Sequence, residues 1–183
     1  MDTDPNNLGY TSRLFKANYD SVFVKDFNIE IKKKLSKKVT VKGTYFKEVF
    51  NASANIVVQD VKGFIFYDIG VLDVTWKLKK KHSLRFEAQG LFTRQDKKNW
   101  ATGIIEYTFS PHWFVAIMDQ YNYGNDDASR RVHYLLGSAG YIKGANRISV
   151  SYGKQREGIF CVGGVCRSVP AANGLTLTIT SSF

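Results

Sequence analysis

Residues 72–79 run Leu-Asp-Val-Thr-Trp-Lys-Leu-Lys, with an apolar side chain at every even position and a polar one at every odd position. After the four residues 80–83, the same pattern returns at 84–89 as Leu-Arg-Phe-Glu-Ala-Gln. Successive side chains of a β-strand point to opposite faces, so strict alternation is typical of strands with one apolar and one polar face. The stretch therefore predicts two antiparallel strands joined by a tight turn.

The alternation extends from Val22 to the C-terminus, and no stretch has a helical period. The predicted strands are Val22 to Leu35, Val39 to Phe50, Phe66 to Lys79, Leu84 to Phe92, Trp100 to Ser110, Trp113 to Tyr123, Val132 to Lys143, Ile148 to Arg156 and Leu175 to Phe183. The alternation is less regular in the fifth to seventh of these strands. The sequence thus predicts an all-β, antiparallel up-and-down meander of about nine or ten long strands.

The connections alternate between short and long. Short turns at 36–38, 80–82, 110–112 and 143–146 separate longer loops at 51–65, 94–99, 124–131 and 157–173. This arrangement favours a barrel with one plain rim and one elaborated rim. Strands of about nine to fourteen residues match the length that a tilted strand needs to cross a bilayer, about 9–11 residues. We therefore expect a transmembrane β-barrel.

Three features favour an apolar face against lipid and a polar face around a lumen. The polar face of the third and fourth strands places the charges of Asp73 and Lys77 beside those of Arg85 and Glu87. Aromatic residues gather near the strand ends, as they do at membrane interfaces. The expected interfacial residues are Trp76, Phe109, Trp113, Phe114 and Tyr141 at the short-turn rim, and Phe92, Trp100, Tyr121 and Tyr123 at the long-loop rim.

The third feature is the C-terminal strand. It alternates Leu175, Leu177 and Ile179 with threonines and ends in Phe183, which resembles the signal that outer-membrane barrels present to their assembly machinery. Ser181 departs from that pattern, because an apolar residue usually stands there. With the C-terminus and short turns in the periplasm, the expected partners are outer-membrane lipid and the barrel-assembly machinery.

Three segments are distinctive: Tyr107 to Asn125, Tyr152 to Arg167, and the closing Asn-Gly-Leu-Thr-Leu-Thr-Ile-Thr-Ser-Ser-Phe. Together they resemble the C-terminal part of an uncharacterised family of outer-membrane β-barrel proteins from Bacteroidota. The resemblance covers residues 22–183 and is densest after Trp100. It implies an outer-membrane barrel, and it carries over no catalytic residue because the family has no assigned activity.

The resemblance also bears on the extent of the barrel, since members of that family are longer and begin with a signal peptide. This chain begins Met-Asp-Thr-Asp-Pro-Asn-Asn, without the basic and apolar segments of a signal peptide. Nine strands are an odd number, whereas single-chain bacterial barrels have an even one. We expect residues 22–183 to be the C-terminal portion of a larger barrel, and residues 1–21 to be a remnant of an extracellular loop or a disordered N-terminus. A tenth strand at 8–18 is the alternative.

Charge and cysteine content narrow the function classes. The chain of 183 residues has a formal net charge of +10. Its lysines crowd into 32–38 and 77–81 without interleaved aromatic residues, which favours solvated turns over nucleic-acid binding.

Cys161 and Cys166 flank Val-Gly-Gly-Val, so a loop-stapling disulfide is feasible in an oxidising compartment. No further Cys or His lies near them to complete a metal site.

Motifs for catalysis and cofactor binding are absent from the sequence. It contains no nucleophile elbow, no Walker loop and no dinucleotide-binding glycine motif. His82 and His112 fall in predicted turns, and nothing at fixed spacing pairs His133 with Asp126 or Asp127. The stretch 122–127 is rich in acids and amides but lacks EF-hand ligand spacing. We expect no enzyme activity, no cofactor and no bound metal.

Two functional classes remain open on these observations. The favoured one is an integral outer-membrane β-barrel protein with a structural, pore or surface-binding role. The alternative is a soluble, lipocalin-like barrel that binds a small apolar ligand inside. A basic nucleic-acid-binding barrel ranks behind both.

Overall fold

The computed structural model describes residues 24–51, 63–95, 97–162 and 165–181, with the backbone alone at 158–161 and 165–167. The predicted strand at 8–18 and the expectation for residues 1–21 lie outside these ranges, and so does Phe183. No helix in the described part of the chain is long and apolar enough to cross a membrane.

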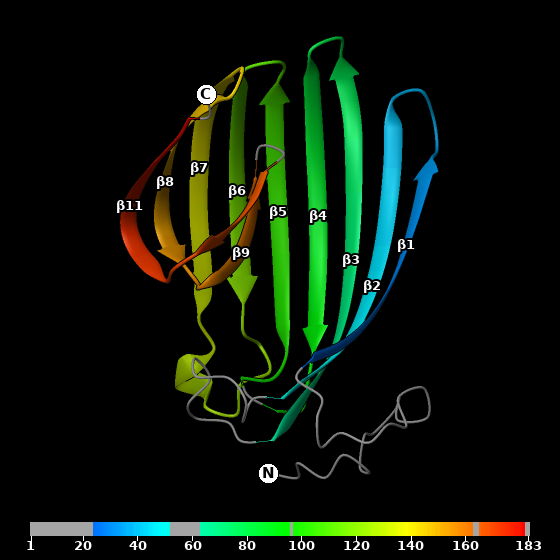
Figure 1. The fold of residues 1–183 in the computed structure, drawn as a ribbon, viewed down its shortest axis with the longest axis vertical. Coiled ribbons are helices and arrows are strands. Elements are labelled where there is room, and N and C mark those ends of the chain that lie inside the picture. The colour runs from blue at the N-terminus through cyan, green and yellow to red at the C-terminus, as the bar shows by residue number, and fades with distance from the viewer. Residues whose placement is uncertain (1–23, 52–62, 96, 163–164, 182–183) are drawn as a thin grey trace.

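Nine strands form one sheet in the order β1-β2-β3-β4-β5-β6-β7-β8-β11, and each strand pairs antiparallel with its neighbours (Figure 1). This confirms the antiparallel meander. The strands are β1 (Val24–Lys34), β2 (Val39–Asn51), β3 (Phe64–Lys79), β4 (His82–Phe92), β5 (Trp100–Phe109), β6 (Trp113–Tyr121), β7 (His133–Lys143), β8 (Asn146–Gln155) and β11 (Ala172–Thr180). Short turns gather at one end of the sheet and long loops at the other.

The sheet is curved and has two chemically different faces. Along β6, the side chains of Phe114, Ala116 and Met118 are buried, whereas Trp113, Val115 and Ile117 are exposed. The buried set points to the concave face and the exposed set to the convex face. Side chains alternate along each strand, and residues paired on neighbouring strands lie on the same face. The division into a concave and a convex set therefore extends from β6 to the neighbouring strands.

The segment 157–173 is not the plain loop that the sequence predicts. It contains β9 (Gly158–Val162) and β10 (Val165–Val169), which form a separate two-stranded hairpin across the concave face (Figure 1). The hairpin covers apolar side chains of β5 to β7, which would otherwise be exposed there. A near-continuous apolar run such as Trp-Phe-Val-Ala-Ile-Met at 113–118 is typical of a strand covered on both faces.

The described strands do not close into a barrel, which corrects the expected closure for this part of the chain. β1 and β11 each have one strand partner, so both are edges of the sheet. In a nine-stranded antiparallel meander the first and last strands run in the same direction. These two edges therefore cannot continue the antiparallel pattern by pairing with each other.

Candidate functional site

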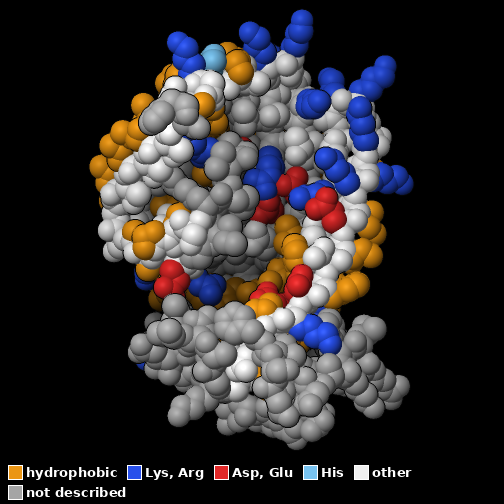
Figure 2. Space-filling model, in the orientation of Figure 1, with side chains coloured by type: hydrophobic (Ala, Val, Ile, Leu, Met, Phe, Trp, Pro, Cys, Tyr) orange, Lys and Arg blue, Asp and Glu red, His pale blue; other side chains and the backbone are white. Residues whose placement is uncertain are grey.

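The convex face carries exposed apolar side chains on strands across the whole width of the sheet. Ile29 on β1, Leu72 on β3, Ile117 on β6 and Leu177 on β11 are each about half or more exposed. Figure 2 shows hydrophobic side chains along both flanks of the molecule, with acidic and basic side chains in the hollow between them. The remaining outward-facing apolar residues with large exposure include Phe27, Ile31, Trp76, Phe86, Ile105, Tyr107, Phe109, Trp113, Val115, Leu135, Ile148, Val150, Tyr152, Leu175 and Ile179.

A charged cluster occupies the concave face of β3, β4 and β5. Arg85 Nε lies 2.5 Å from Asp73 Oδ2, its Nη2 pairs with Glu87, and its Nη1 lies 3.8 Å from Glu106 Oε2. The three carboxylate residues are at most 9% exposed. One guanidinium thus stands among three buried carboxylates, where ion pairs are shielded from solvent far more than on a surface.

The strand register explains why these four side chains meet. Asp73 lies opposite Glu87, and Arg85 lies opposite Glu106. Glu106 was missed by the sequence reasoning because the alternation in β5 did not reveal which residues point inward. The sequence did contain one signal for Glu106. When β4 and β5 pair as a hairpin, Glu106 falls directly opposite Arg85. Lys77 is on β3 nearer the short-turn rim, and its side chain is exposed outside this cluster.

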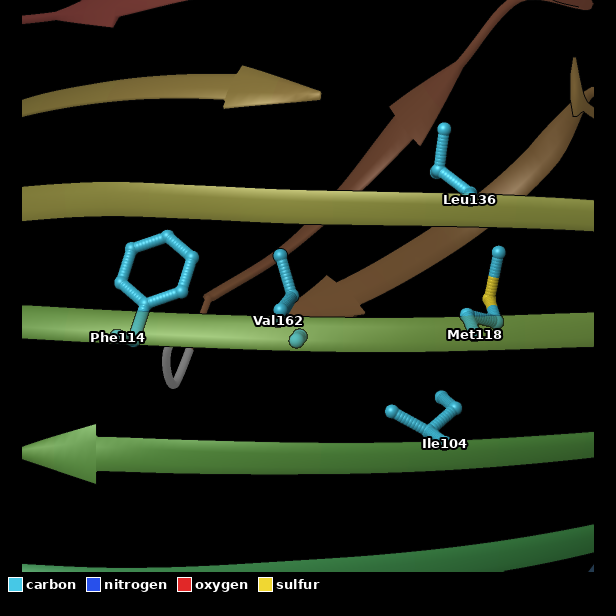
Figure 3. Close-up of a cluster of buried hydrophobic side chains, with 6 residues drawn as sticks. Ile104, Phe114, Met118, Leu136 and Val162 are labelled. Atoms are coloured by element: carbon cyan, nitrogen blue, oxygen red, sulfur yellow. The ribbon is translucent and has the colours of Figure 1, made fainter. Parts of the chain in front are cut away.

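The hairpin fills another part of the concave face. The side chain of Val162, 3% exposed, packs among Ile104, Phe114, Met118 and Leu136, as Figure 3 shows. Two hydrogen bonds anchor the hairpin to β8: Arg147 Nη2 donates to the Val162 carbonyl oxygen at 2.9 Å, and Gln155 Nε2 donates to that of Pro170 at 2.8 Å. The hollow is therefore charged beside β3 to β5 and filled by an apolar contact beside β5 to β7.

A family model described as a family of unknown function, DUF6029, matches residues 1–183. The chain belongs to the DUF6029 family. Comparisons with curated proteins and with solved structures find no match. Membership in DUF6029 assigns neither an activity nor a location, so the outer-membrane origin in Bacteroidota stays a prediction.

Two of the expected interfacial aromatic residues of this DUF6029 chain do not lie on the convex face. Trp100 and Phe114 are 5% and 2% exposed, on the concave side, and each lies under an arginine. β5 and β6 carry apolar residues on both faces, so alternation does not distinguish the inward set there. Trp76 and Trp113 are 45% and 55% exposed on the convex side near the short turns. Tyr121 and Tyr123 lie at the long-loop rim.

The histidines have partners that sequence spacing does not indicate. His133 Nδ1 lies 2.7 Å from Asp119 Oδ2, and its ring stacks on Tyr121 with centroids 4.1 Å apart. It therefore pairs with neither Asp126 nor Asp127. The His82 ring contacts the Tyr107 hydroxyl at 2.5 Å, and His112 Nδ1 donates to the Ile142 carbonyl oxygen at 2.7 Å.

The acidic side chains of the 122–127 stretch form hydrogen bonds and an ion pair with nearby residues. Asp127 caps the short 3₁₀ helix Ala128–Arg130 by accepting hydrogen bonds from the hydroxyl and backbone N–H of Ser129. The Ser129 hydroxyl, followed by that N–H, lowers the pKa of Asp127. Asp126 Oδ1 lies 2.5 Å from Lys98 Nζ. Within the described residues, no group of three or more His, Cys, Asp or Glu side chains could hold a metal ion.

The backbone of the hairpin places Cys161 directly opposite Cys166. Their side chains lie outside the described part of the chain, so the disulfide stays a prediction. Directly opposite residues on antiparallel strands have Cα atoms about 4.5–5.5 Å apart, which a disulfide can bridge. Protein purified without reductant and then denatured is expected to show no thiol reactive toward Ellman's reagent, and both thiols after reduction. Full reactivity before reduction would contradict the disulfide.

Proposed function

We propose that this chain forms part of an integral outer-membrane β-barrel whose convex face contacts lipid and whose concave face lines the lumen. The observation that carries the proposal is the exposed apolar convex face opposite a buried charged cluster. Soluble monomers rarely expose a contiguous apolar patch larger than about 300–600 Å². In an outer-membrane barrel, by contrast, the outward face is apolar and the interior is polar.

Strand length and rim chemistry support the membrane placement. The nine strands of the sheet have 9 to 16 residues, at or above the bilayer requirement of about 9–11. Trp76 and Trp113 stand at the short-turn rim, where amphipathic rings would meet the headgroups. In the proposed orientation, the short turns and the C-terminus are periplasmic and the long loops are extracellular.

Closure of the barrel requires strands beyond the nine of this sheet. Since β1 and β11 run in the same direction, an odd number of further antiparallel strands must stand between them. The total is then even, as in single-chain bacterial barrels. We propose that these strands come from protein outside the described residues.

The C-terminal strand β11 is the proposed contact with the assembly machinery. Leu175, Leu177 and Ile179 are 60–73% exposed on its convex side, and its edge away from β8 has no strand partner in the described sheet. A free edge can pair with an incoming strand through its backbone. The hairpin in the hollow favours a structural or surface-binding role over that of a wide, open pore.

The soluble lipocalin-like alternative needs the opposite distribution of side chains. Such a barrel binds its ligand on an apolar interior and presents a polar exterior to water. Here the charged Arg85 cluster lies on the concave face, and exposed apolar side chains lie on the convex face.

Refolding tests this proposal directly. Diluted from urea into buffer, the chain is expected to aggregate through the exposed apolar side chains of its convex face. Diluted into micelles of lauryldimethylamine oxide, it is expected to gain a β-sheet circular dichroism spectrum and heat-dependent migration on electrophoresis gels. A monodisperse, folded protein in buffer alone would contradict the membrane placement.

The Ile117→Lys variant provides a second measurement. Ile117 is 49% exposed at the middle of β6 on the convex face. If that face contacts lipid, the lysine should lower the free energy of unfolding in phospholipid vesicles by about 2–4 kcal/mol. If it contacts water, the change should stay within about 0.5 kcal/mol. Thr176→Lys on the concave side of β11 is the matched control.

A further inference from the structure

A small pocket lies at the long-loop rim, where the ends of β5, β6 and β7 meet the loops that connect them. Its volume is about 260 Å³. This is slightly below the range of about 300–1,000 Å³ for sites of drug-sized ligands, so it suits a ligand of one ring. The residues that matter to its chemistry are Lys97, Trp100, Asn122, Asn125, Arg130 and Tyr134.

The two loops that form the pocket are locked together. Asn122 Nδ2 donates to the Lys97 carbonyl oxygen at 2.9 Å, and Gly124 N–H donates to that of Asn99 at 3.1 Å. A Cβ on Gly124 would lie 2.5 Å from the Asn99 nitrogen, so a side chain at position 124 would separate the loops. The ion pair of Lys98 with Asp126 adds a third connection. The pocket is thus pre-formed, which reduces the ordering cost of binding.

One buried acceptor in the pocket wall has no partner. Asn122 is 1% exposed, and its Oδ1 accepts no hydrogen bond within the described residues. Its Nδ2 donates to the Lys97 carbonyl oxygen, which fixes the direction of the amide. An unsatisfied buried polar atom costs about 1–3 kcal/mol, so a ligand hydroxyl that donates to it would be favoured.

Trp100 and Tyr134 also line the pocket, and each of these rings has a basic side chain from outside the lining over it. The rings of Trp100 and Tyr134 lie 5.8 Å apart, with the Arg156 guanidinium 4.1 Å from the first ring and the Lys154 ammonium 4.7 Å from the second. Neither cation, nor Lys97, forms an ion pair with a carboxylate of the described residues. The site therefore combines apolar ring surface with positive charge that has no ion-pair partner in the part of the chain that the structure describes.

We propose that this pocket binds an acidic sugar, a hydroxylated ring that bears one carboxylate. A hydroxyl donates to Asn122 Oδ1, the C–H face of the ring packs against Trp100 and Tyr134, and the carboxylate accepts hydrogen bonds from Lys97 or Arg156. A neutral sugar would bring no carboxylate to the cations, and a simple carboxylate would leave Asn122 Oδ1 unsatisfied. The residues named for the site all lie in the described part of the chain, and the proposal does not depend on the membrane placement.

Isothermal titration of the folded protein with three probes tests the proposal. The probes are D-glucuronate, methyl β-D-glucoside and acetate, in a zwitterionic detergent without sugar headgroups. Glucuronate is expected to bind about tenfold more tightly than either other probe, because only it satisfies both Asn122 and the cations. Equal affinity for glucuronate and the neutral glucoside, or no binding of any probe, would overturn the proposal without affecting the refolding test.

Two variants assign the contacts. Asn122→Leu should weaken glucuronate binding about tenfold, while the same substitution at the exposed Asn146, at the opposite rim, should leave it unchanged. Should Asn122→Leu fail to fold, Arg156→Gln decides, because it should bring the affinity for glucuronate down to that for the neutral glucoside. Undiminished preference for glucuronate in Arg156→Gln would contradict the charge assignment.

Discussion

Replacing Arg85 with glutamine is expected to lower the free energy of unfolding by about 3–5 kcal/mol, because it removes a guanidinium that pairs with buried carboxylates. Arg85 contacts Asp73, Glu87 and Glu106, all at most 9% exposed. Glutamine keeps a hydrogen-bond donor and removes the positive charge. The decrease in the free energy of unfolding therefore measures the mutual repulsion and the desolvation of the acids. Urea unfolding in phospholipid vesicles, followed by tryptophan fluorescence, measures the effect.

A double variant shows whether the effect is electrostatic. Arg85→Gln combined with Glu87→Gln removes one of the three competing carboxylates. The double variant is therefore expected to be more stable than Arg85→Gln alone, although it has lost more charged groups. The interpretation fails if Arg85→Gln stays within about 0.5 kcal/mol of the parent, the range of an ordinary surface substitution.

The second large effect is expected at Val162, where lysine should release the hairpin from the concave face. The Val162 side chain is buried among Phe114, Met118 and Leu136, and Arg147 lies against the same strand. An ammonium group there would be buried among apolar side chains and beside another cation, which costs several kcal/mol. The packing of Val162 and of the partly buried Val169 on the cluster is not expected to offset this cost, so the hairpin should undock while the nine-stranded sheet remains.

Hydrogen exchange followed by mass spectrometry measures the release. Amide protons of β9 and β10 should exchange much faster in Val162→Lys, while those of β5 to β7 keep their protection. Ser168→Lys is the matched control, since residue 168 is exposed on the same hairpin. Unchanged protection of the hairpin in Val162→Lys would show that its position does not depend on the apolar contact.

The meander was predictable because its signals are local. Alternation at 72–79 and 84–89, and the short turns at 36–38 and 110–112, specify strands and their order without knowledge of distant contacts. The observed strands begin and end within a few residues of the predicted ones. The two exceptions are β9 and β10, five-residue strands in a segment rich in glycine, whose pairing depends on a hairpin too short for a clear period.

Which side chains of β5 and β6 point to the concave face was not predictable, for a different reason. Trp100 and Phe114 belong to strands with apolar residues at both parities, so the pattern is equally consistent with either face. Contact with the hairpin decides which set is buried. For the same reason Glu106 was missed, while Asp73, Arg85 and Glu87 stood out against clean alternation.

By itself, then, the sequence determined an antiparallel meander with one plain and one elaborated rim, because period and turn chemistry act over a few residues. Only the tertiary structure decided which side chains contact one another across the concave face and at the long-loop rim. It brought Glu106 to Arg85, Val162 into the apolar cluster, and Asn122 into a pocket with Trp100 and Tyr134. Those contacts join residues that are distant along the chain, and they depend on sheet curvature and loop packing, which alternation along a single strand does not encode.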